Sequence, residues 1–153
     1  MEAKLLEPLQ GLTKCGRIAA RLARHVEVAL ASVDLTPSQY RVLMRLAEGP
    51  SGASVLASGL AVSRPSLTAV VDGLVARGLV ERNSDPADRR RVGHRLTDEG
   101  SRALQAGDQA LEERLQEVLG YATHAQAAQV RKGLEALEEP LGAFRAARLA
   151  QKQ

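Results

Sequence analysis

The stretch Ser63–Thr97, SRPSLTAVVDGLVARGLVERNSDPADRRRVGHRLT, decides the fold. It opens with a predicted helix, because Ser63 is a good N-cap and Pro65 stands in the first turn, where a missing N–H costs nothing. Gly78 has the place of the glycine that commonly follows a helix end. Between them, four apolar residues recur at helical spacing: Leu67, Val70, Val71 and Leu74.

Two strands and a basic loop follow this helix. The residues predict strands at Leu79–Arg82 and Val92–Leu96, joined by a turn-rich loop that closes on Arg89, Arg90 and Arg91. Helix, strand, basic hairpin and strand is the order of a recognition helix followed by a wing. A helix of this kind fits the DNA major groove, and arginines on a hairpin tip suit the neighbouring minor groove. Asp88 is expected to orient the arginine side chains.

A second helix precedes the recognition helix. Thr36 is a candidate N-cap for a helix over Pro37–Ala47, residues 49–52 predict a turn, and Ala53–Leu60 predicts a short helix. Residues 61 and 62 then leave room only for a tight connection into the helix capped by Ser63. Two short helices joined in this way indicate a helix-turn-helix.

The charge of the chain is concentrated on the predicted wing. The 153 residues carry a formal net charge of +3. Residues 82–95 contain five arginines against two aspartates, which equals that whole excess. Such a local positive patch is the electrostatic signature of a nucleic-acid-binding surface.

Long helices with apolar stripes are predicted on both sides of this module. One covers residues 1–33, a second Asp98–Leu119, and a third runs from His124 to about Ala150 with a kink or break near Glu139 caused by Pro140. We therefore expect a mainly α fold with an N-terminal dimerisation helix (1–33), a winged helix-turn-helix (34–97) and C-terminal dimerisation helices (98–153). A two-fold dimer would match a palindromic operator in double-stranded DNA.

Several classes of protein are disfavoured. A single cysteine, Cys15, excludes an internal disulfide, and the dispersed histidines have no metal-ligand spacing. The start of the chain lacks a secretion signal and no apolar run reaches membrane length, so we expect a cytoplasmic protein without a membrane partner. No catalytic set or cofactor motif is present, which argues against an enzyme and predicts no cofactor or metal.

Three segments of the chain resemble the MarR (multiple antibiotic resistance regulator) family of bacterial repressors. They are LTPSQYRVLMRLAEGP, VSRPSLTAVVDGLVARGLVERNSDPADRRRV and the closing RLTDEG. The resemblance implies a homodimeric winged-helix DNA-binding regulator in which the first and the last two helices form the dimerisation domain. It places the following residues against DNA: Ser63, Arg64, Ser66, Thr68 and Ala69 in the major groove, Arg89, Arg90 and Arg91 on the wing, and Thr36, Ser38 and Gln39 at phosphates. Ala69 stands where relatives often carry a longer polar or basic side chain, which shifts weight to Arg64, the wing and DNA shape.

The same resemblance implies an effector site between the dimerisation helices and the winged module, often for phenolic or other aromatic acids. The candidate lining residues are Arg17, Arg21, His25, Tyr40 and Arg41, and the competing interpretation is ordinary surface charge. Cys15 lies near the position of a peroxide-sensing cysteine in some relatives. Redox sensing is therefore one alternative, against a buried, inert cysteine. A winged-helix adaptor for an acidic protein partner is the other alternative.

Overall fold

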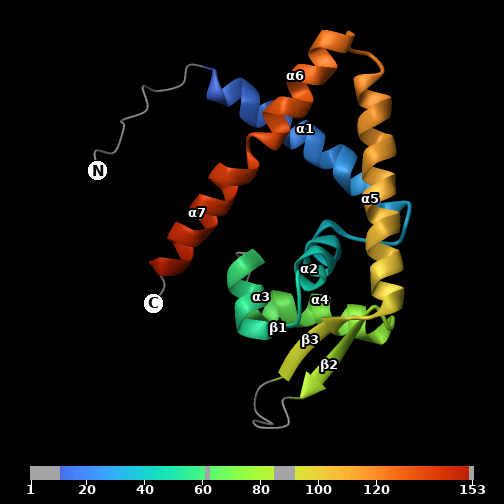
Figure 1. The fold of residues 1–153 in the computed structure, drawn as a ribbon, viewed down its shortest axis with the longest axis vertical. Coiled ribbons are helices and arrows are strands. Elements are labelled where there is room, and N and C mark those ends of the chain that lie inside the picture. The colour runs from blue at the N-terminus through green and yellow to red at the C-terminus, as the bar shows by residue number, and fades with distance from the viewer. Residues whose placement is uncertain (1–10, 61–62, 85–91, 152–153) are drawn as a thin grey trace.

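The computed structural model of the protein describes residues 11–60, 63–84 and 92–151. Its helices are α1 (Leu12–Ala31), α2 (Pro37–Ala47), α3 (Ala53–Leu60), α4 (Arg64–Ala76), α5 (Asp98–Leu119), α6 (His124–Glu135) and α7 (Glu138–Ala150). Its strands are β1 (Ser51–Gly52), β2 (Val80–Ser84) and β3 (Val92–Leu96). The helices α1, α5, α6 and α7, which we call the stem, extend from one end of a module formed by α2–α4 and the strands (Figure 1).

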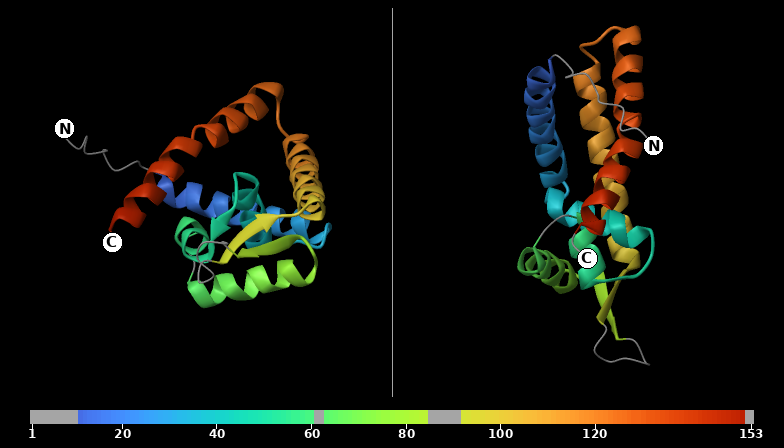
Figure 2. Two further views of the ribbon diagram at one scale, coloured as in Figure 1. Left: turned by 60° about the horizontal axis from the view of Figure 1, so that its bottom comes forward. Right: turned by 90° about the vertical axis from the view of Figure 1, so that its left-hand side faces the viewer.

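This module is a winged helix, as expected from the sequence. The chain bends by 114° between α3 and α4, in the range of helix-turn-helix motifs. The strands form an antiparallel sheet in the order β1–β3–β2, with His94 of β3 opposite Ser51 of β1 and Arg82 of β2. The β2–β3 hairpin points away from the stem (Figure 2).

One apolar core holds the module together and reaches into the base of the stem. Its fully buried leucines are Leu30, Leu43, Leu56 and Leu74, one from each of α1, α2, α3 and α4. Leu67 and Val71 join them from the inner face of α4, while Val70 is partly buried. Burial of these side chains fixes α4 with its opposite face outward, since apolar burial is the main term that favours folding.

Most element boundaries follow from capping. Thr36, Ser63, Thr97 and Thr123 accept hydrogen bonds from backbone N–H groups in the first turns of α2, α4, α5 and α6. Gly78 follows the end of α4 with a φ of +70°, a conformation that favours glycine. The predicted bounds of α2, α3, β3 and α5 are confirmed.

The predicted helix over residues 1–33 is too long. In the described chain α1 begins at Leu12, after Gly11 with a φ of +94°, and it ends at Ala31. Residues 1–10 lie outside the described range. The part of the prediction around Leu5 and Leu9 is therefore untested, whereas the predicted continuity through Gly11 is wrong, because periodicity does not report a backbone break at a glycine.

The turn and strand boundaries also need correction. Residues 51–52 were expected in a turn but form β1, which pairs with β3, so the sheet has a strand that sequence patterns missed. β2 starts one residue later than expected and continues through Asn83 and Ser84, which pair with Gly93 and Val92. Tertiary pairing overrides the weak strand propensity of these polar residues.

The kink or break predicted near Glu139 is found as a break between two helices. α6 ends at Glu135 and α7 starts at Glu138, so the break precedes Pro140. Proline lacks the N–H that would bond to the carbonyl four residues earlier, at Ala136, and its ring clashes with that carbonyl. Pro140 instead stands in the first turn of α7, where proline is tolerated.

The stem leaves apolar side chains uncovered. Val130, Leu134, Leu137, Leu141 and Phe144, on and between α6 and α7, are between 40% and 63% exposed. Among the described residues, no single helix has both the length and the apolar character needed to cross a membrane; the one pair that meets both criteria together is α3 with α4.

Candidate nucleic-acid interface

The outer face of α4 is a surface of short polar and small side chains. Ser63 Oγ accepts from the Ser66 backbone N–H at 3.3 Å and lies 2.8 Å from Ser66 Oγ. Ser66, Thr68 and Ala69 are exposed, whereas Leu67 and Val71 face the core. At Ser66, Thr68 and Ala69 the first turns of α4 therefore offer hydroxyl groups and a small side chain to a partner.

The N-terminus of α2 carries a capping box. Thr36 Oγ1 accepts from the Gln39 N–H at 3.2 Å, and Gln39 Oε1 accepts from the Thr36 N–H at 2.9 Å. Both residues thus have a structural role besides the predicted phosphate contact. A threonine hydroxyl that accepts one bond retains its own proton for donation, so the two roles are compatible.

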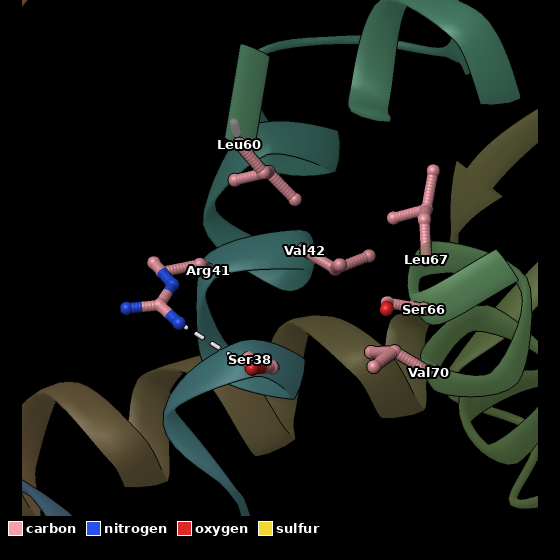
Figure 3. Close-up of a pocket in the computed structure, with 7 residues that line it drawn as sticks. All are labelled: Ser38, Arg41, Val42, Leu60, Ser66, Leu67 and Val70. Carbon is pink, nitrogen blue, oxygen red and sulfur yellow. Dashed lines mark hydrogen bonds between the residues drawn. The ribbon is translucent and has the colours of Figure 1, made fainter. Parts of the chain in front are cut away.

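The structure brings Ser38 of α2 and Ser66 of α4 to one cleft. They line a cavity of ≈ 40 Å³ together with Arg41, Val42, Leu60, Leu67 and Val70. Ser66 points toward α2, whereas the Arg41 guanidinium lies away from α4 and donates to Ser38 Oγ at 3.3 Å (Figure 3). Two residues predicted to touch different parts of DNA thus share one local surface.

The two described arginines of the wing are paired within the protein. Arg82 of β2 forms an ion pair with Asp72 of α4, and Arg95 Nε of β3 donates to Glu81 Oε1 at 2.6 Å. Sequence counting assigned both arginines to the basic patch, but each has an acidic neighbour from outside that count. The positive charge available for a nucleic acid therefore rests mainly on Arg89–Arg91.

His94 lies behind the outer face of α4 and was missed as a structural residue. We expected it to face solvent or a phosphate, but it is 5% exposed and lines a cavity with Leu67, Thr68 and Asp72. Burial lowers the pKa of His94, with a smaller opposing effect from its hydrogen bond to the Ser51 backbone. Alternation along β3 could have revealed this, since His94 and Leu96 share one side of the strand.

Other predicted contact residues lie outside what the structure describes. These are Asp88, Arg89, Arg90 and Arg91 in the segment 85–91, and the side chain of Arg64. The backbone of Arg64 is the first helical residue of α4. The proposed roles of these five side chains stay predictions.

Tyr40, a predicted pocket residue, joins α2 to α5 instead. Its hydroxyl donates to Asp108 Oδ1 at 2.5 Å, and its ring lies against Gly107. Burial, together with the hydrogen bond and the negative charge of Asp108, raises the pKa of Tyr40 well above its usual value. The phenol therefore remains a hydrogen-bond donor throughout the neutral pH range.

Two of the five candidate pocket residues, His25 and Arg41, border different cavities in the protomer. Arg17 and Arg21 are exposed on α1, and His25 borders a cavity of ≈ 630 Å³ with Arg114, Glu117, Val118 and Tyr121. Arg41 borders a different cavity of ≈ 670 Å³ between α2, α3 and α7. Its other lining residues are Met44, Arg45, Glu48, Gly59, Leu60, Glu138, Leu141, Gly142 and Arg145.

Cys15 is exposed on α1, which contradicts the expectation of a buried cysteine. Within residues 11–60, 63–84 and 92–151, no three His, Cys, Asp or Glu side chains are grouped so that they could hold a metal ion.

Comparison with known proteins places the chain among transcriptional regulators. The model of the MarR family matches residues 33–91. The HTH-type transcriptional regulator FarR of Neisseria gonorrhoeae is 35% identical over 111 residues, which span 69% of this chain and 76% of FarR. These relatives are regulators, which supports the expectation that the chain is not an enzyme.

Solved structures agree over most of the chain. Wild-type MarR of E. coli in its apo form has a TM-score of 0.71 at 26% identity, covering 87% of this chain and 98% of that one. The transcriptional regulator BldR of Sulfolobus solfataricus has a TM-score of 0.71 at 28% identity, covering 94% and 99%. The likeness therefore includes stem helices that the family model does not match.

Proposed function

Since this chain belongs to the MarR family of transcriptional regulators, with its DNA-binding winged-helix fold, we propose that it is a homodimeric repressor that binds a palindromic operator and is released by a small ligand. One observation carries the proposal. The exposed apolar residues of α6 and α7 lie in the stem, away from the outer face of α4. The molecule thus separates a surface that needs an apolar partner from a surface suited to DNA.

A second copy of the chain is the proposed cover for the stem. Leu137, Leu141 and Phe144 are 49%, 63% and 63% exposed, and contiguous apolar surface of this kind marks a protein interface. In a two-fold dimer, the apolar patch of one subunit packs against the same patch of the other subunit. This pairing also places two recognition helices roughly 34–36 Å apart, one turn of DNA, which matches a palindromic site.

The proposed DNA contacts follow the geometry of the module. The first turns of α4, with Ser63, Arg64, Ser66, Thr68 and Ala69, enter the major groove. The wing arginines 89–91, oriented by Asp88, enter the minor groove, where the negative potential is strongest. Thr36, Ser38 and Gln39 at the N-terminus of α2 contact phosphates, since the hydroxyl groups of Thr36 and Ser38 can donate and the helix dipole favours anions there.

The lining of the cavity between α2, α3 and α7 is the basis for proposing a ligand with an apolar body and a carboxylate. Met44, Leu60 and Leu141 supply apolar surface, and its arginines are Arg41, Arg45 and Arg145. Arg45 pairs with Glu48 through Nη1, but its buried Nε has no hydrogen-bond partner within the described part of the chain. An aromatic acid matches this combination, since binding sites are mostly apolar with a few placed polar groups.

The test of dimeric DNA binding uses the full chain. Light scattering after size exclusion measures its mass, and duplexes selected from a randomised pool give its preferred site. We expect a dimer, an inverted repeat, and a slope of log affinity against log salt near −0.9 for each neutralised phosphate. Leu141→Glu should yield a weakly binding monomer. A wild-type monomer with full affinity, or an Arg90→Ala variant with unchanged affinity, would overturn the proposal and favour the protein adaptor.

The ligand requires a separate measurement. Benzoate and salicylate should raise the melting temperature and weaken binding to the selected duplex, whereas neutral benzamide should do neither. Replacing Arg45 by Met keeps an unbranched, apolar stem but removes the guanidinium, and should abolish the benzoate effect. Equal shifts with benzamide, or an unchanged benzoate effect in Arg45→Met, would exclude recognition of the carboxylate at this cavity.

A further inference from the structure

Helix α5 is seated on the winged module through two buried glycines. Gly100 and Gly107 are seven residues apart, close to two helical turns, so they share one face of α5. A Cβ added to Gly100 would lie 2.0 Å from the Leu79 carbonyl oxygen, and one added to Gly107 would lie 2.9 Å from Tyr40 Cδ2. The close approach at both points leaves no space for a side chain.

The Tyr40 ring is held in place from two directions. Its hydroxyl donates to Asp108, the residue after Gly107, and the ring also packs against the apolar core. The ring therefore has no free path away from α5. Any group added at Gly107 must displace α5 itself or break the hydrogen bond.

The recognition helix is anchored at the same place. Arg77, which caps the C-terminus of α4, donates through Nη1 to the Asp34 carbonyl at 2.7 Å. The next residue, Leu35, is 3% exposed, and its Cδ1 lies 3.3 Å from the position of a Cβ on Gly107. A chain of direct contacts thus links the end of α4 with the seat of α5.

We propose that Leu35, Tyr40, Gly107 and Asp108 form a joint that sets the angle between the winged module and α5, and thereby the separation of the two recognition helices in the dimer. The proposal rests on the proposed function only for the pairing of two chains. Tyr40 and Asp108 are positioning residues in this scheme, and they need no contact with DNA.

A small rotation at the joint has a large effect at the reading end. Helix α4 has 13 residues and is therefore about 20 Å long at 1.5 Å per residue. A rotation of about 5° at its C-terminal end moves its N-terminal end by roughly 1.7 Å, and two-fold symmetry adds the same movement in the partner. The sum approaches the 3.4 Å step between base pairs, so the joint selects among half-site spacings.

The distance between recognition helices is the direct readout. A Cys15→Ser, Ala69→Cys chain carries one nitroxide on α4, and double electron–electron resonance gives the distance between the two labels of a dimer. In this background, Tyr40→Phe should broaden the distribution and Gly107→Ala should move its maximum. Tyr121→Phe, at a tyrosine that is 97% exposed, and Gly16→Ala, at an exposed glycine of α1 whose Cβ position has no atom within 4 Å, should match the parent.

Further variants protect the test against a folding defect. Asp108→Asn keeps an oxygen acceptor and should retain the parent distribution, whereas Asp108→Ala should broaden it as Tyr40→Phe does. If Tyr40→Phe, Gly107→Ala and Asp108→Ala all give the parent distribution, the joint has no role in setting the distance. If the parent shows no dipolar coupling at all, the dimer itself is wrong.

DNA binding gives the second readout. The duplex selected by the wild-type chain is lengthened or shortened by one base pair between its half-sites. Gly107→Ala should bind the original spacing about tenfold more weakly and should prefer one of the altered spacings. Equal losses on all three duplexes would overturn the assignment to spacing, since they would indicate a general loss of binding.

Discussion

The carboxylate of Asp72 pairs with the guanidinium of Arg82, so the recognition helix α4 is tied directly to strand β2 of the wing. The two side chains come from elements that would otherwise meet only through the core. His94 of β3 lies in register with Arg82 and borders the same cavity as Asp72. The relative position of helix and wing, which a DNA-binding surface must hold constant, therefore depends on a polar contact as well as on apolar packing.

We predict a small but measurable coupling between these two residues. Asp72→Asn, Arg82→Gln and the double variant form a cycle that isolates the pairwise energy in urea unfolding. Because both side chains are about half exposed, at 52% and 51%, we expect a coupling of only about 0.2–1 kcal/mol. DNA affinity should fall more in Arg82→Gln than the stability change alone explains.

The Glu81–Arg95 pair provides the matched control. It is similarly exposed, at 45% and 59%, but it joins two strands of the same hairpin rather than the hairpin to α4. Removing it should give a comparable coupling energy and leave DNA affinity closer to that of the wild type. Equal affinity losses from the two pairs would show that the helix–wing tie has no special role.

The burial of His94 predicts a pH dependence of stability. The imidazole titrates near 6.5 when solvated, and burial lowers its pKa in the folded protein. Protonation therefore favours the unfolded chain, so the contribution is intact above pH 6.5 and is lost as the pH falls through the lower, folded pKa. The free energy of unfolding should decrease from pH 7.5 to 5.5, by no more than about 1.4 kcal/mol per pH unit for this group.

Substituting His94 tests whether this residue causes the pH dependence of the free energy of unfolding. His94→Gln should flatten the curve between pH 7.5 and 5.5, whereas His25→Gln, at an exposed position on α1, should not. Chemical unfolding at a series of pH values gives both curves. A slope unaffected by His94→Gln would place the responsible group elsewhere.

Most of the module could be predicted from the sequence because its signals are local. The caps at Thr36 and Ser63 and the glycine after α4 each act over a few residues, and all three are found as expected. β1 could not be predicted, since two residues become a strand only by pairing with β3 from 40 residues away in sequence. The same limit applies to Tyr40, whose partner Asp108 is 68 residues away.

The candidate site shows the corresponding limit for function. Spacing placed Ser66, Thr68 and Ala69 on the outer face of α4 because Leu67 and Val71 define the inner face. The sequence could not show that Arg82 forms an ion pair with Asp72, because a count of charges does not tell which of them lie close together in the fold. Likewise, the sequence could not show that His25 and Arg41, two of the five pocket candidates, border different cavities in the protomer.

Substitutions at the capping box of Thr36 can separate the effect of this residue on stability from its effect on DNA affinity. Thr36→Ala should lower the free energy of unfolding by about 1 kcal/mol, and Thr36→Ser should restore it. Thr123 makes the same kind of capping box at α6 and supplies the control, because it lies in the stem. Thr123→Ala should cost similar stability with unchanged DNA affinity. If Thr36→Ala binds the selected duplex as well as Thr123→Ala does, Thr36 makes no phosphate contact.

Gly100 gives the sharpest test of how α5 is seated. In Gly100→Ala, the new methyl group would meet the Leu79 carbonyl oxygen at 2.0 Å and Leu96 Cδ1 at 2.8 Å, and a backbone carbonyl cannot turn aside as a flexible side chain can. We expect a loss of at least the roughly 1–3 kcal/mol typical of an overpacked core, measured by urea unfolding.

Gly133→Ala, at a helical glycine with open space around it, should raise the free energy of unfolding, whereas Gly100→Ala lowers it. No atom lies within 4 Å of the Cβ position at Gly133, so alanine there gains helix propensity of about 0.5–1 kcal/mol without a clash. Alanine loses less backbone freedom than glycine on folding, and this favours alanine at both sites. A difference in stability between the two variants therefore measures the steric contact at Gly100. A Gly100→Ala protein as stable as Gly133→Ala would mean that α5 can stand away from Leu79, and that this end of the helix does not fix its position on the module.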